Sequence, residues 1–348
     1  MNQDKVKVNL SGVSETLLGP LWARAKVSRE HSSLFYDANA VELVEKIDYD
    51  FSMFDMISFG DFLPLLFVAR ARQFDKKVRA YITEHPRASV VNIGAGLDAT
   101  FYRVDNGTIH WYDLDLPAVI EIRKRLIPEP DRVTYIAKSL FDTSWCRDVS
   151  TEGGVFMIAG GLFRYFEEAQ VKQFFSMLAD NFPGGEIIFN ASSGKESHFR
   201  MWIEQLLPDQ QKELEAALME TLKCRWEAAS QDQKDTLTSL FKIPTSLHGT
   251  VWADIKAWWD LLSDKEKGGA MRDFISGLMR SPRWGTRLSK WALKDANEIT
   301  RWDNRITVID QFPLFKDIPR DPSLSLAIRE FMDFSDKNRT SNIFHLSV

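Results

Sequence analysis

The chain of 348 residues is long enough to bury one large core, or one core together with a subdomain. A hydrophobic content of 44%, a charged content of 27% and a net charge of −5 indicate a globular protein without the basic surface that a nucleic-acid partner needs. No run of about 18 apolar residues predicts a membrane span, and the opening segment MNQDKVKVNLSG lacks the apolar core of a secretory signal. Cys146 and Cys224 form no disulfide framework and no His/Cys cluster has metal-ligand spacing, so we expect a cytoplasmic protein without a metal site.

The N-terminal quarter of the chain is predicted to be helical. Residues 12–60 have the pattern of amphipathic helices, and apolar residues then recur at spacings of three and four from Leu63 to Ile82. Pro86 ends that pattern, because proline cannot continue a helix. We therefore assign residues 1–88 to an N-terminal helical region.

From residue 89 onward, short apolar segments alternate with helical ones. The predicted strands are 89–93, 109–113, 133–136, 155–159 and 186–190, and the predicted helices are 98–104, 117–126 and 167–181. Apolar strands joined by helices predict a parallel sheet buried on both faces, which is an α/β fold of the Rossmann-like type. Two late strands, at 305–312 and 341–346, flank a helix near 323–333. The predicted core domain thus comprises residues 89–194 and 287–348.

Residues 195–286 interrupt this alternation with an aromatic-rich segment. The pattern predicts several helices, such as 208–229 and 251–262, and a loop of this length is seldom without structure. We interpret the segment as a helical insertion that serves as a lid over the substrate, as the surface of a homodimer, or as a buttress without chemistry. We favour the lid, because the segment leaves the sheet after its fifth strand, at the edge where open α/β sheets bind ligands.

The most informative stretch is SVVNIGAGLDATFYRVDNGTIHWYDLDLP, residues 89–117. One apolar strand leads into Gly94 and Gly96, and the next strand ends in Asp113 and Asp115. Glycine permits a turn with positive φ and a close approach of the backbone to a ligand. A carboxylate at the tip of the following strand can accept hydrogen bonds from both hydroxyls of a ribose. The stretch therefore predicts a ligand that contains adenosine.

Two such ligands compete for this turn, a nicotinamide dinucleotide and S-adenosylmethionine. The dinucleotide pattern is G-x-G-x-x-G, whose third position here is Ala99, as the looser form of the pattern allows. Asp98 would place negative charge near a pyrophosphate, whereas S-adenosylmethionine has no phosphate and carries a sulfonium cation. We therefore favour the methyl donor and keep a nicotinamide-dependent oxidoreductase as an alternative.

This stretch is one of several sequence segments that occur along the chain in a definite order. They are NIGAGLDATFYR with WYDLDLP, FVARARQFDKKV at 67–78, FMIAGGLFRYFEEAQVKQFF at 156–175, FPGGEIIFNASS at 182–193, and KWALKDANEITRWDNRITVIDQFPLF at 290–315. In order and spacing they resemble the leucine carboxyl methyltransferase superfamily, and above all its bacterial branch of tetracenomycin-type polyketide O-methyltransferases. The resemblance implies a class I methyltransferase fold with one late strand antiparallel, S-adenosylmethionine as cofactor, and O-methyltransferase activity.

The resemblance and the chemistry of the side chains together suggest the donor-binding residues. Asp115 would bind the ribose hydroxyls, as the acid directly before x-Pro, with Asp113 as its competitor. Arg70 would bind the carboxylate of the donor, because a guanidinium fork matches a planar carboxylate, and Arg24 or Lys26 would add a second cation.

The turn itself would contribute backbone groups. Gly94, Ala95 and Gly96 would line the amino-acid portion and the ribose of the donor. Asp98 would contact the ligand or cap the following helix, and these two roles are left open.

Two positions depart from the family pattern. Ser139 and Leu140 occupy the implied adenine contact, but the chain reads Ser-Leu-Phe-Asp where the family often has Asp-Leu-Arg-Asp. Gly160 and Gly161 follow the fourth strand, and many family members have a glutamate at the first of these positions. Tyr165 matches a tyrosine of the family and would orient the acceptor, line the donor pocket, or simply pack in the core.

The acceptor decides whether the reaction needs a base. A carboxylate, with a pKa of about 4, is already ionised at neutral pH, whereas a phenol near pKa 10 needs help. Among the histidines, His31, His198 and His248 lie in segments that could reach a substrate, and no His–Asp pairing is apparent. This favours a carboxylate acceptor.

The aromatic content suggests what kind of molecule carries that carboxylate. The 24 Phe and 11 Trp favour a bulky apolar small molecule such as a polyketide, unless these rings only build the core. A protein C-terminus as acceptor, and an inactive module that only binds the donor, remain alternatives.

Overall fold

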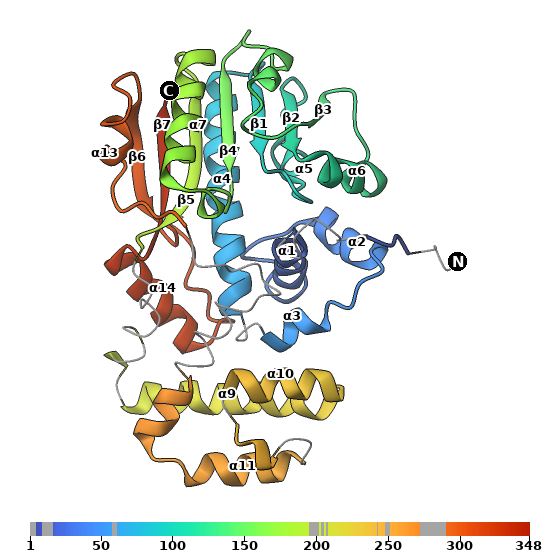
Figure 1. Ribbon diagram of the computed structural model, residues 1–348, viewed down its shortest axis with the longest axis vertical. Helices are drawn as coiled ribbons and strands as arrows, with labels where there is room; N and C mark the ends of the chain where they lie inside the picture. Colours follow the sequence, from blue (N-terminus) through green and yellow to red (C-terminus); the bar gives the residue numbers. More distant parts are fainter. Residues whose placement is uncertain are drawn as a thin grey trace.

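The computed structural model describes residues 5–8, 17–57, 61–194, 202, 205–206, 208–241, 243–247, 251–271 and 290–348. Its strands are β1 Ser89–Ile93, β2 His110–Asp115, β3 Val133–Ala137, β4 Val155–Ala159, β5 Glu186–Ser192, β6 Thr307–Pro313 and β7 Ser341–Ser347. They form one seven-stranded sheet in the order β3-β2-β1-β4-β5-β7-β6 (Figure 1). Only β7 in this sheet is antiparallel to its neighbours, β5 and β6. The predicted α/β fold with one antiparallel late strand is therefore confirmed.

Helices cover the sheet and extend beyond one of its edges. They are α1 Leu18–Glu30, α2 Ala38–Lys46, α3 Ser52–Ile57, α4 Phe62–Glu84, α5 Thr100–Val104, α6 Pro117–Leu126, α7 Glu168–Asn181, α9 Pro208–Ala228, α10 Gln231–Phe241, α11 Trp252–Leu261, α13 Asn297–Thr300 and α14 Leu326–Asn338. Short 3-10 helices occur at η2 Thr143–Asp148, η3 Phe163–Tyr165 and η4 Thr245–Leu247. The strands begin and end within two residues of the predicted bounds.

The central strands are buried on both faces, as a parallel sheet between helices requires. Every residue of β1 and of β4 is buried. Because side chains alternate along a strand, Val90 and Phe156 belong to the core that also contains α4 residues, whereas Val91 and Met157 belong to the core that contains α7 residues. Two separate cores thus hold the sheet between its helices.

The order of the strands reverses between β1 and β4, and the crevice expected of open α/β sheets lies at the carboxyl ends of these strands. β1 pairs with β2 on one side and with β4 on the other, all in parallel, so the connections leave in opposite directions. Open α/β sheets bind ligands at the carboxyl ends of the strands at such a position. In Figure 1 this edge of the sheet faces downward, toward α1.

The predicted insertion is helical where the structure describes it. Helices α9, α10 and α11 lie below α3 and α14 in Figure 1. Gln210 in α9 donates a hydrogen bond of 2.7 Å from Nε2 to Glu330 in α14. Trp226 and Trp259 are almost completely buried, so these two rings build the core of the insertion rather than line an open pocket. Trp284, His198 and His248 lie outside the described residues. The lid and the homodimer surface stay predictions.

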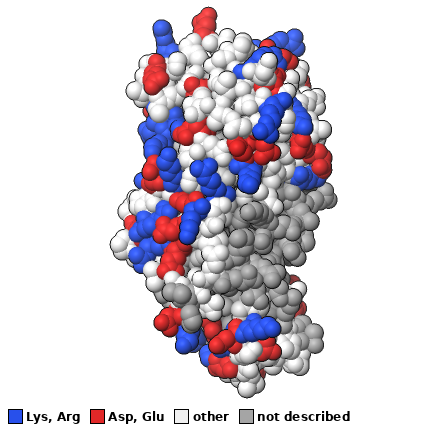
Figure 2. Space-filling view, turned by 90° about the vertical axis from the view of Figure 1, so that its left-hand side faces the viewer, with Lys and Arg blue, Asp and Glu red and all other residues white. Residues whose placement is uncertain are grey.

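Both signs of charge are interspersed on the described residues of the face drawn in Figure 2. Lys and Arg side chains there lie among Asp and Glu side chains, and neither sign forms a continuous patch. Exposed ion pairs such as Arg305 with Asp180, at 2.7 Å, add little to stability. Within the part of the chain that the structure describes, no helix combines the length and the apolar character needed to cross a bilayer.

Candidate functional site

The two glycines after β1 form a sharp bend that other residues would strain. Gly94 and Gly96 have φ values of +70° and +52°. A Cβ at Gly94 would lie 2.9 Å from a methyl of Leu162, and one at Gly96 would lie 2.7 Å from a methyl of Leu17. The predicted glycine bend is therefore present, and it occupies the carboxyl end of β1 beside the reversal of strand order.

The carboxylate predicted to bind a ribose lies next to this bend. Asp115, the last residue of β2, accepts hydrogen bonds of 2.8 Å from the N–H of Gly96 and 2.7 Å from that of Leu116. Burial raises the pKa of Asp115, and these two N–H groups oppose the rise. The residue is partly exposed, so it remains accessible to a ligand at the tip of the strand.

The competing acid, Asp113, is fully buried and already satisfied. Its oxygens accept hydrogen bonds from Arg123 Nη2 at 2.6 Å, Trp111 Nε1 at 2.9 Å and Asn92 Nδ2 at 3.1 Å. Of the two acids at this strand, Asp113 therefore serves the fold and Asp115 faces the crevice. The assignment of Asp115 to the ribose stays a prediction.

Two buried arginines hold consecutive carbonyls of the bend. Arg123 Nη1 donates to Gly96 O at 3.0 Å, and Arg24 Nη2 donates to Leu97 O at 3.0 Å. Arg24 Nε is also bound to Asp37 at 3.0 Å. The predicted role of Arg24 as a second cation for the donor is thus not the one these contacts favour, because two of its nitrogens are engaged by the protein. Lys26, its alternative, pairs with Glu30 at 2.6 Å.

Asp98 belongs to a charged network behind the bend. It accepts from Thr100 Oγ1 at 2.5 Å and lies 3.6 Å from Arg103 Nη2 and 3.9 Å from Arg24 Nη1. Burial opposes its ionisation, but the charges of Arg24 and Arg103 prevail and lower the pKa of Asp98 to about 2. Helix α5 has Ala99 at its N-cap and no side-chain cap, so the capping alternative for Asp98 is wrong.

Arg103 connects this network to the N-terminal helices. This connection was not predicted from the sequence. The Arg103 guanidinium contacts Asp75 in α4 at 2.7 Å and Asp37, the N-cap of α2, also at 2.7 Å. Asp75 and Asp37 lie 28 and 66 positions from Arg103 in the sequence, so no local spacing predicts these contacts. Through Arg103 the bend is fixed to α2 and α4.

Arg70 in α4 reaches the turn after β4. A Cβ at Gly161 would lie 2.5 Å from Arg70 Nη1, and one at Gly160 would lie 3.3 Å from Arg70 Nε. The Arg70 guanidinium also lies 5.4 Å from the centroid of the Phe67 ring. Gly160 therefore leaves room for Arg70, which gives a physical reason for glycine where many family members have a glutamate.

No residue that the structure describes forms an ion pair with the guanidinium of Arg70. Among the described residues it makes no ion pair and no hydrogen bond. Burial, and next the charge of Arg24, lower the pKa of Arg70 to about 10, while Asp98 acts in the opposite direction. A buried cation without a partner is costly, and a ligand carboxylate would relieve that cost.

The turns after β3 and β4 complete the edge. Ser139 Oγ accepts from the N–H of Phe141 at 3.3 Å, and Leu140 O accepts from Trp145 Nε1 at 3.1 Å, so both residues stabilise their own turn. The N–H of Gly161, whose φ is +70°, donates to Asn190 Oδ1 at 2.7 Å. The adenine contact at Ser139 and Leu140 stays a prediction.

Tyr165 follows in η3 and is accessible. It is 39% exposed, so the interpretation that it packs in the core is wrong. The preceding residue, Arg164, lies over its ring at 5.9 Å from the centroid. Tyr165 is thus positioned to meet a molecule that approaches the turn after β4.

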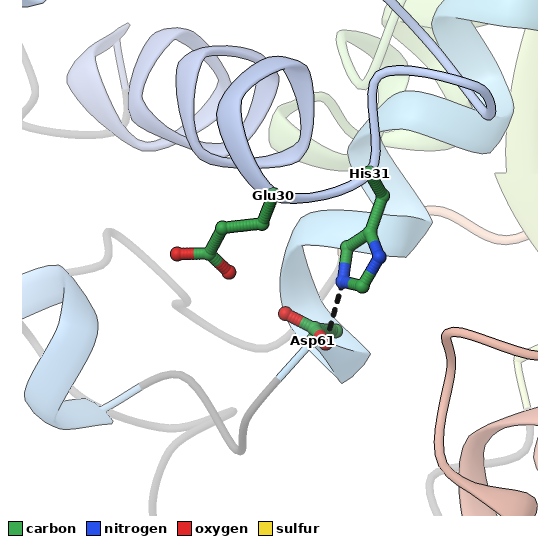
Figure 3. A group of neighbouring side chains, drawn as sticks. All are labelled: Glu30, His31 and Asp61. Atoms are coloured by element: carbon green, nitrogen blue, oxygen red, sulfur yellow. Dashed lines mark hydrogen bonds and ion pairs between the residues drawn. The ribbon is translucent and has the colours of Figure 1, made fainter.

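A histidine–carboxylate pairing, which the sequence did not indicate, occurs at His31. Its Nε2 lies 3.1 Å from Asp61 (Figure 3). Its Nδ1 lies 3.0 Å from Ser323 Oγ, 292 positions away in the chain. Likewise, His345 Nε2 lies 2.7 Å from Glu186. The structure thus contains a His–Asp pairing that was not apparent in the sequence, because folding joins distant segments.

The surroundings of His31 favour a structural role. Glu30, His31 and Asp61 present ligand atoms within 4.8 Å of one another, but Glu30 is paired with Lys26 and both ring nitrogens of His31 are engaged. The cluster ties the end of α1 to the start of α4 and to the loop before α14.

Comparisons with known proteins agree with this architecture. A family model described as leucine carboxyl methyltransferase matches residues 18–179, which include Arg70, the glycine bend, Asp115 and Tyr165. The tetracenomycin polyketide synthesis O-methyltransferase TcmP of Streptomyces glaucescens is 36% identical over 185 residues, or 53% of this chain and 67% of that protein. The S-adenosyl-L-methionine-dependent methyltransferase dpfgK of Gibberella zeae is 30% identical over 214 residues, or 56% of this chain and 71% of that protein.

Solved structures with a similar arrangement share little sequence with this chain. One from Thermobifida fusca, described as a candidate methyltransferase, covers 93% of both chains at 11% identity with a TM-score of 0.44. One of the duf574 family from Streptomyces avermitilis covers 94% of this chain and 96% of that one at 10% identity with a TM-score of 0.45.

The sheet order, the bend and the acid beside it define an α/β enzyme whose crevice lies at the reversal of strand order. The sequence relationships identify the kind of enzyme. The chain belongs to the leucine carboxyl methyltransferase family, and it is a methyltransferase.

Proposed function

We propose that the chain transfers a methyl group from S-adenosylmethionine to a carboxylate on a bulky apolar small molecule. The observation that carries the donor is Arg70, a partly buried guanidinium at the edge of the sheet for which the described residues provide no counter-ion. The names of two relatives, one an S-adenosylmethionine-dependent enzyme and one a polyketide O-methyltransferase, support the same donor and a similar class of acceptor.

The residues at the edge fit the parts of this donor. Arg70 would hold its carboxylate through two parallel hydrogen bonds, and Asp115 would accept from the ribose hydroxyls. Gly94 and Gly96 would allow the backbone to approach, while Ser139 and Leu140 would border the adenine. No phosphate is needed to satisfy these groups.

The charges behind the bend argue against a dinucleotide. Arg24, Arg103 and Arg123 are each paired with an acid of the protein, at 3.0, 2.7 and 2.6 Å. These three arginines behind the bend are therefore already committed to the protein, and Asp98, ionised at neutral pH, would repel a pyrophosphate. This removes the support for a nicotinamide-dependent oxidoreductase.

The work of the chain in this reaction is alignment. The bound donor supplies an electrophilic methyl group on its sulfonium. The chain has to hold donor and acceptor in line and exclude water, and such alignment contributes about 7–11 kcal/mol to lowering a barrier. Because a carboxylate acceptor with a pKa of about 4 is ionised at neutral pH, the mechanism needs no base. Tyr165 would orient the acceptor from the turn after β4.

Calorimetry followed by a transfer assay tests the proposal. We expect the wild-type chain to bind S-adenosylhomocysteine, the demethylated donor, and to transfer labelled methyl to members of a panel of aromatic carboxylic acids. Absence of S-adenosylhomocysteine binding would contradict the donor assignment. Binding without transfer to any carboxylic acid, phenol or peptide C-terminus would instead identify a module that only binds the donor.

A further inference from the structure

The turn after β4 carries a second arginine to which no described residue offers a carboxylate. Arg164 lies in η3, three residues after Gly161, and its guanidinium lies 5.9 Å from the centroid of the Tyr165 ring. Its Nε is buried without a hydrogen-bond partner, and its side chain forms no ion pair with any described residue. A buried donor in that condition is rare and costly in folded proteins.

Other buried arginines around the crevice have found partners in the protein. Arg24 and Arg103 both bind Asp37, and Arg123 binds Asp113 and a carbonyl of the bend although its own Nε is unpaired. Arg329 in α14 also has an unpaired Nε, but it is not among the charges that affect Arg70. Unlike Arg24, Arg103 and Arg123, the side chain of Arg164 has no carboxylate or carbonyl partner among the described residues.

Arg164 lies close to the other unpaired guanidinium of the site. Arg70 Nη1 packs so closely on Gly161 that a Cβ there would be 2.5 Å away. Burial first, then Arg24 and, more weakly, Arg164 lower the pKa of Arg70 to about 10. The turn after β4 therefore presents two neighbouring cations that the protein does not neutralise.

Two free guanidinium groups call for two anionic groups. The donor has one carboxylate, and Arg70, beside the crevice, is suited to it. The second cation then requires a negative charge on the other substrate. The guanidinium carbon of Arg164 lies over the exposed ring of Tyr165, so a cation and an aromatic surface lie side by side, which suits a planar carboxylate on an apolar body.

We propose that Arg164 binds the carboxylate of the methyl acceptor and, with Tyr165, makes the enzyme select acceptors that carry a carboxylate on an aromatic or similarly apolar body. This inference rests on the proposed function and names the specificity-determining residue for it. Sequence reasoning singled out Tyr165 but passed over Arg164.

The chemistry balances with Arg164 in this role. Arg164 holds one oxygen of the acceptor carboxylate, and the other oxygen gives its electron pair to the methyl carbon. The carbon–sulfur bond breaks and its electron pair stays on sulfur, so a sulfonium and a carboxylate become a neutral thioether and a neutral methyl ester. No proton is moved. The ester no longer carries the charge that Arg164 binds, which favours release of the product.

The test compares a carboxylate with its uncharged analogue. Full-length protein saturated with S-adenosylhomocysteine is titrated with anthracene-2-carboxylate and with anthracene-2-carboxamide in a calorimeter. We expect the wild type to bind the carboxylate at least tenfold more tightly than the carboxamide. Arg164→Gln should remove this preference, Arg164→Lys should retain part of it, and both variants should bind S-adenosylhomocysteine as the wild type does. Arg125→Gln, at an exposed arginine, is the matched control.

Each other outcome has a definite meaning. Equal affinity of the wild type for the two probes, or no affinity for either, overturns the proposal. If Arg164→Gln weakens S-adenosylhomocysteine binding as much as Arg70→Gln does, Arg164 belongs to the donor site and the proposal is overturned as well. If the wild type does not bind S-adenosylhomocysteine at all, the proposed function fails instead. Thermal unfolding and the Arg164→Lys variant separate these results from loss of folding.

Discussion

The arginines on the two sides of the crevice differ in whether the protein supplies them with a partner. On the side of β1 and β2, Arg24, Arg103 and Arg123 are each bound to an aspartate or a backbone carbonyl of the protein. On the side of β4, Arg70 and Arg164 have aromatic rings beside them and no carboxylate among the described residues. Arginine thus stabilises the bend on one side, whereas on the other side it remains available to an anionic ligand.

This difference indicates that some charged residues of one site contribute to the stability of the fold and others to the affinity for a ligand. A paired buried arginine is fixed, and removing either partner leaves an uncompensated charge. An unpaired arginine costs the folded protein stability, and a bound anion restores it. Substitutions on the first side should therefore act on stability, and substitutions on the second side should act on ligand affinity.

The largest expected effect is that of Arg123→Ala, on the paired side. The substitution leaves Asp113 buried without its cation and releases the carbonyl of Gly96. We expect the free energy of unfolding to fall by about 3–5 kcal/mol, measured by urea denaturation. Arg125→Ala, on the same helix but exposed, should change it by less than about 0.5 kcal/mol. An Arg123→Ala protein as stable as the wild type would break the comparison.

Acid titration should reveal the network around Asp98. Its pKa of about 2 in the folded protein lies below the value of about 3.9 in an unfolded chain. Its ionised form therefore stabilises the fold above about pH 4, and this contribution, about 2–3 kcal/mol, is lost as the pH falls toward 2. Asp98→Asn should flatten the pH dependence of the unfolding free energy between pH 4 and 2, whereas the exposed Asp131→Asn should not. Parallel wild-type and Asp98→Asn curves would show that Arg24 and Arg103 do not stabilise this carboxylate.

On the unpaired side, Arg70→Gln should weaken binding without harming the fold. A charge-assisted hydrogen bond is worth about 1.5–3 kcal/mol, so the Kd for S-adenosylhomocysteine should rise about 10- to 100-fold in calorimetry. The unfolding free energy of the free protein should not fall, because no counter-ion is lost. Arg79→Gln, at an exposed position of the same helix, is the control. Unchanged affinity of Arg70→Gln would remove this arginine from the site.

The two aspartates of β2 allow the same comparison, between an effect on stability and an effect on ligand affinity, within a single strand. Asp115→Asn should weaken S-adenosylhomocysteine binding about tenfold, or about 1.4 kcal/mol, with little loss of stability. Asp113→Asn should lower the unfolding free energy because it disrupts the pair with Arg123, and it should leave affinity nearly unchanged. If Asp113→Asn weakened binding more than Asp115→Asn, and Asp115→Asn lowered stability more, the ribose-binding role would have to be assigned to Asp113.

Local pattern was sufficient for the framework of the fold. Strands such as 155–159 and helices such as 117–126 coincide with their predicted bounds, because apolar periodicity and Pro117 act within a few residues. The glycine bend followed from Gly94 and Gly96, whereas the preference for Asp115 over Asp113 as the ribose acid came from the family resemblance and stays a prediction. The order of the quoted segments led to the family to which the chain belongs.

Long-range contacts determined the remaining roles. Arg24 meets the bend 73 positions away, and its role as a second cation for the donor stays a prediction, while His31 meets Ser323 292 positions away. Arg164 gave no signal in the sequence, since an arginine beside a tyrosine is equally suited to solvent or to a site. The sequence by itself therefore determined the strands, the bend and the class of enzyme. Only the tertiary structure decided which arginines are paired, because the partner of a buried charge is whatever the fold brings within about 4 Å of it.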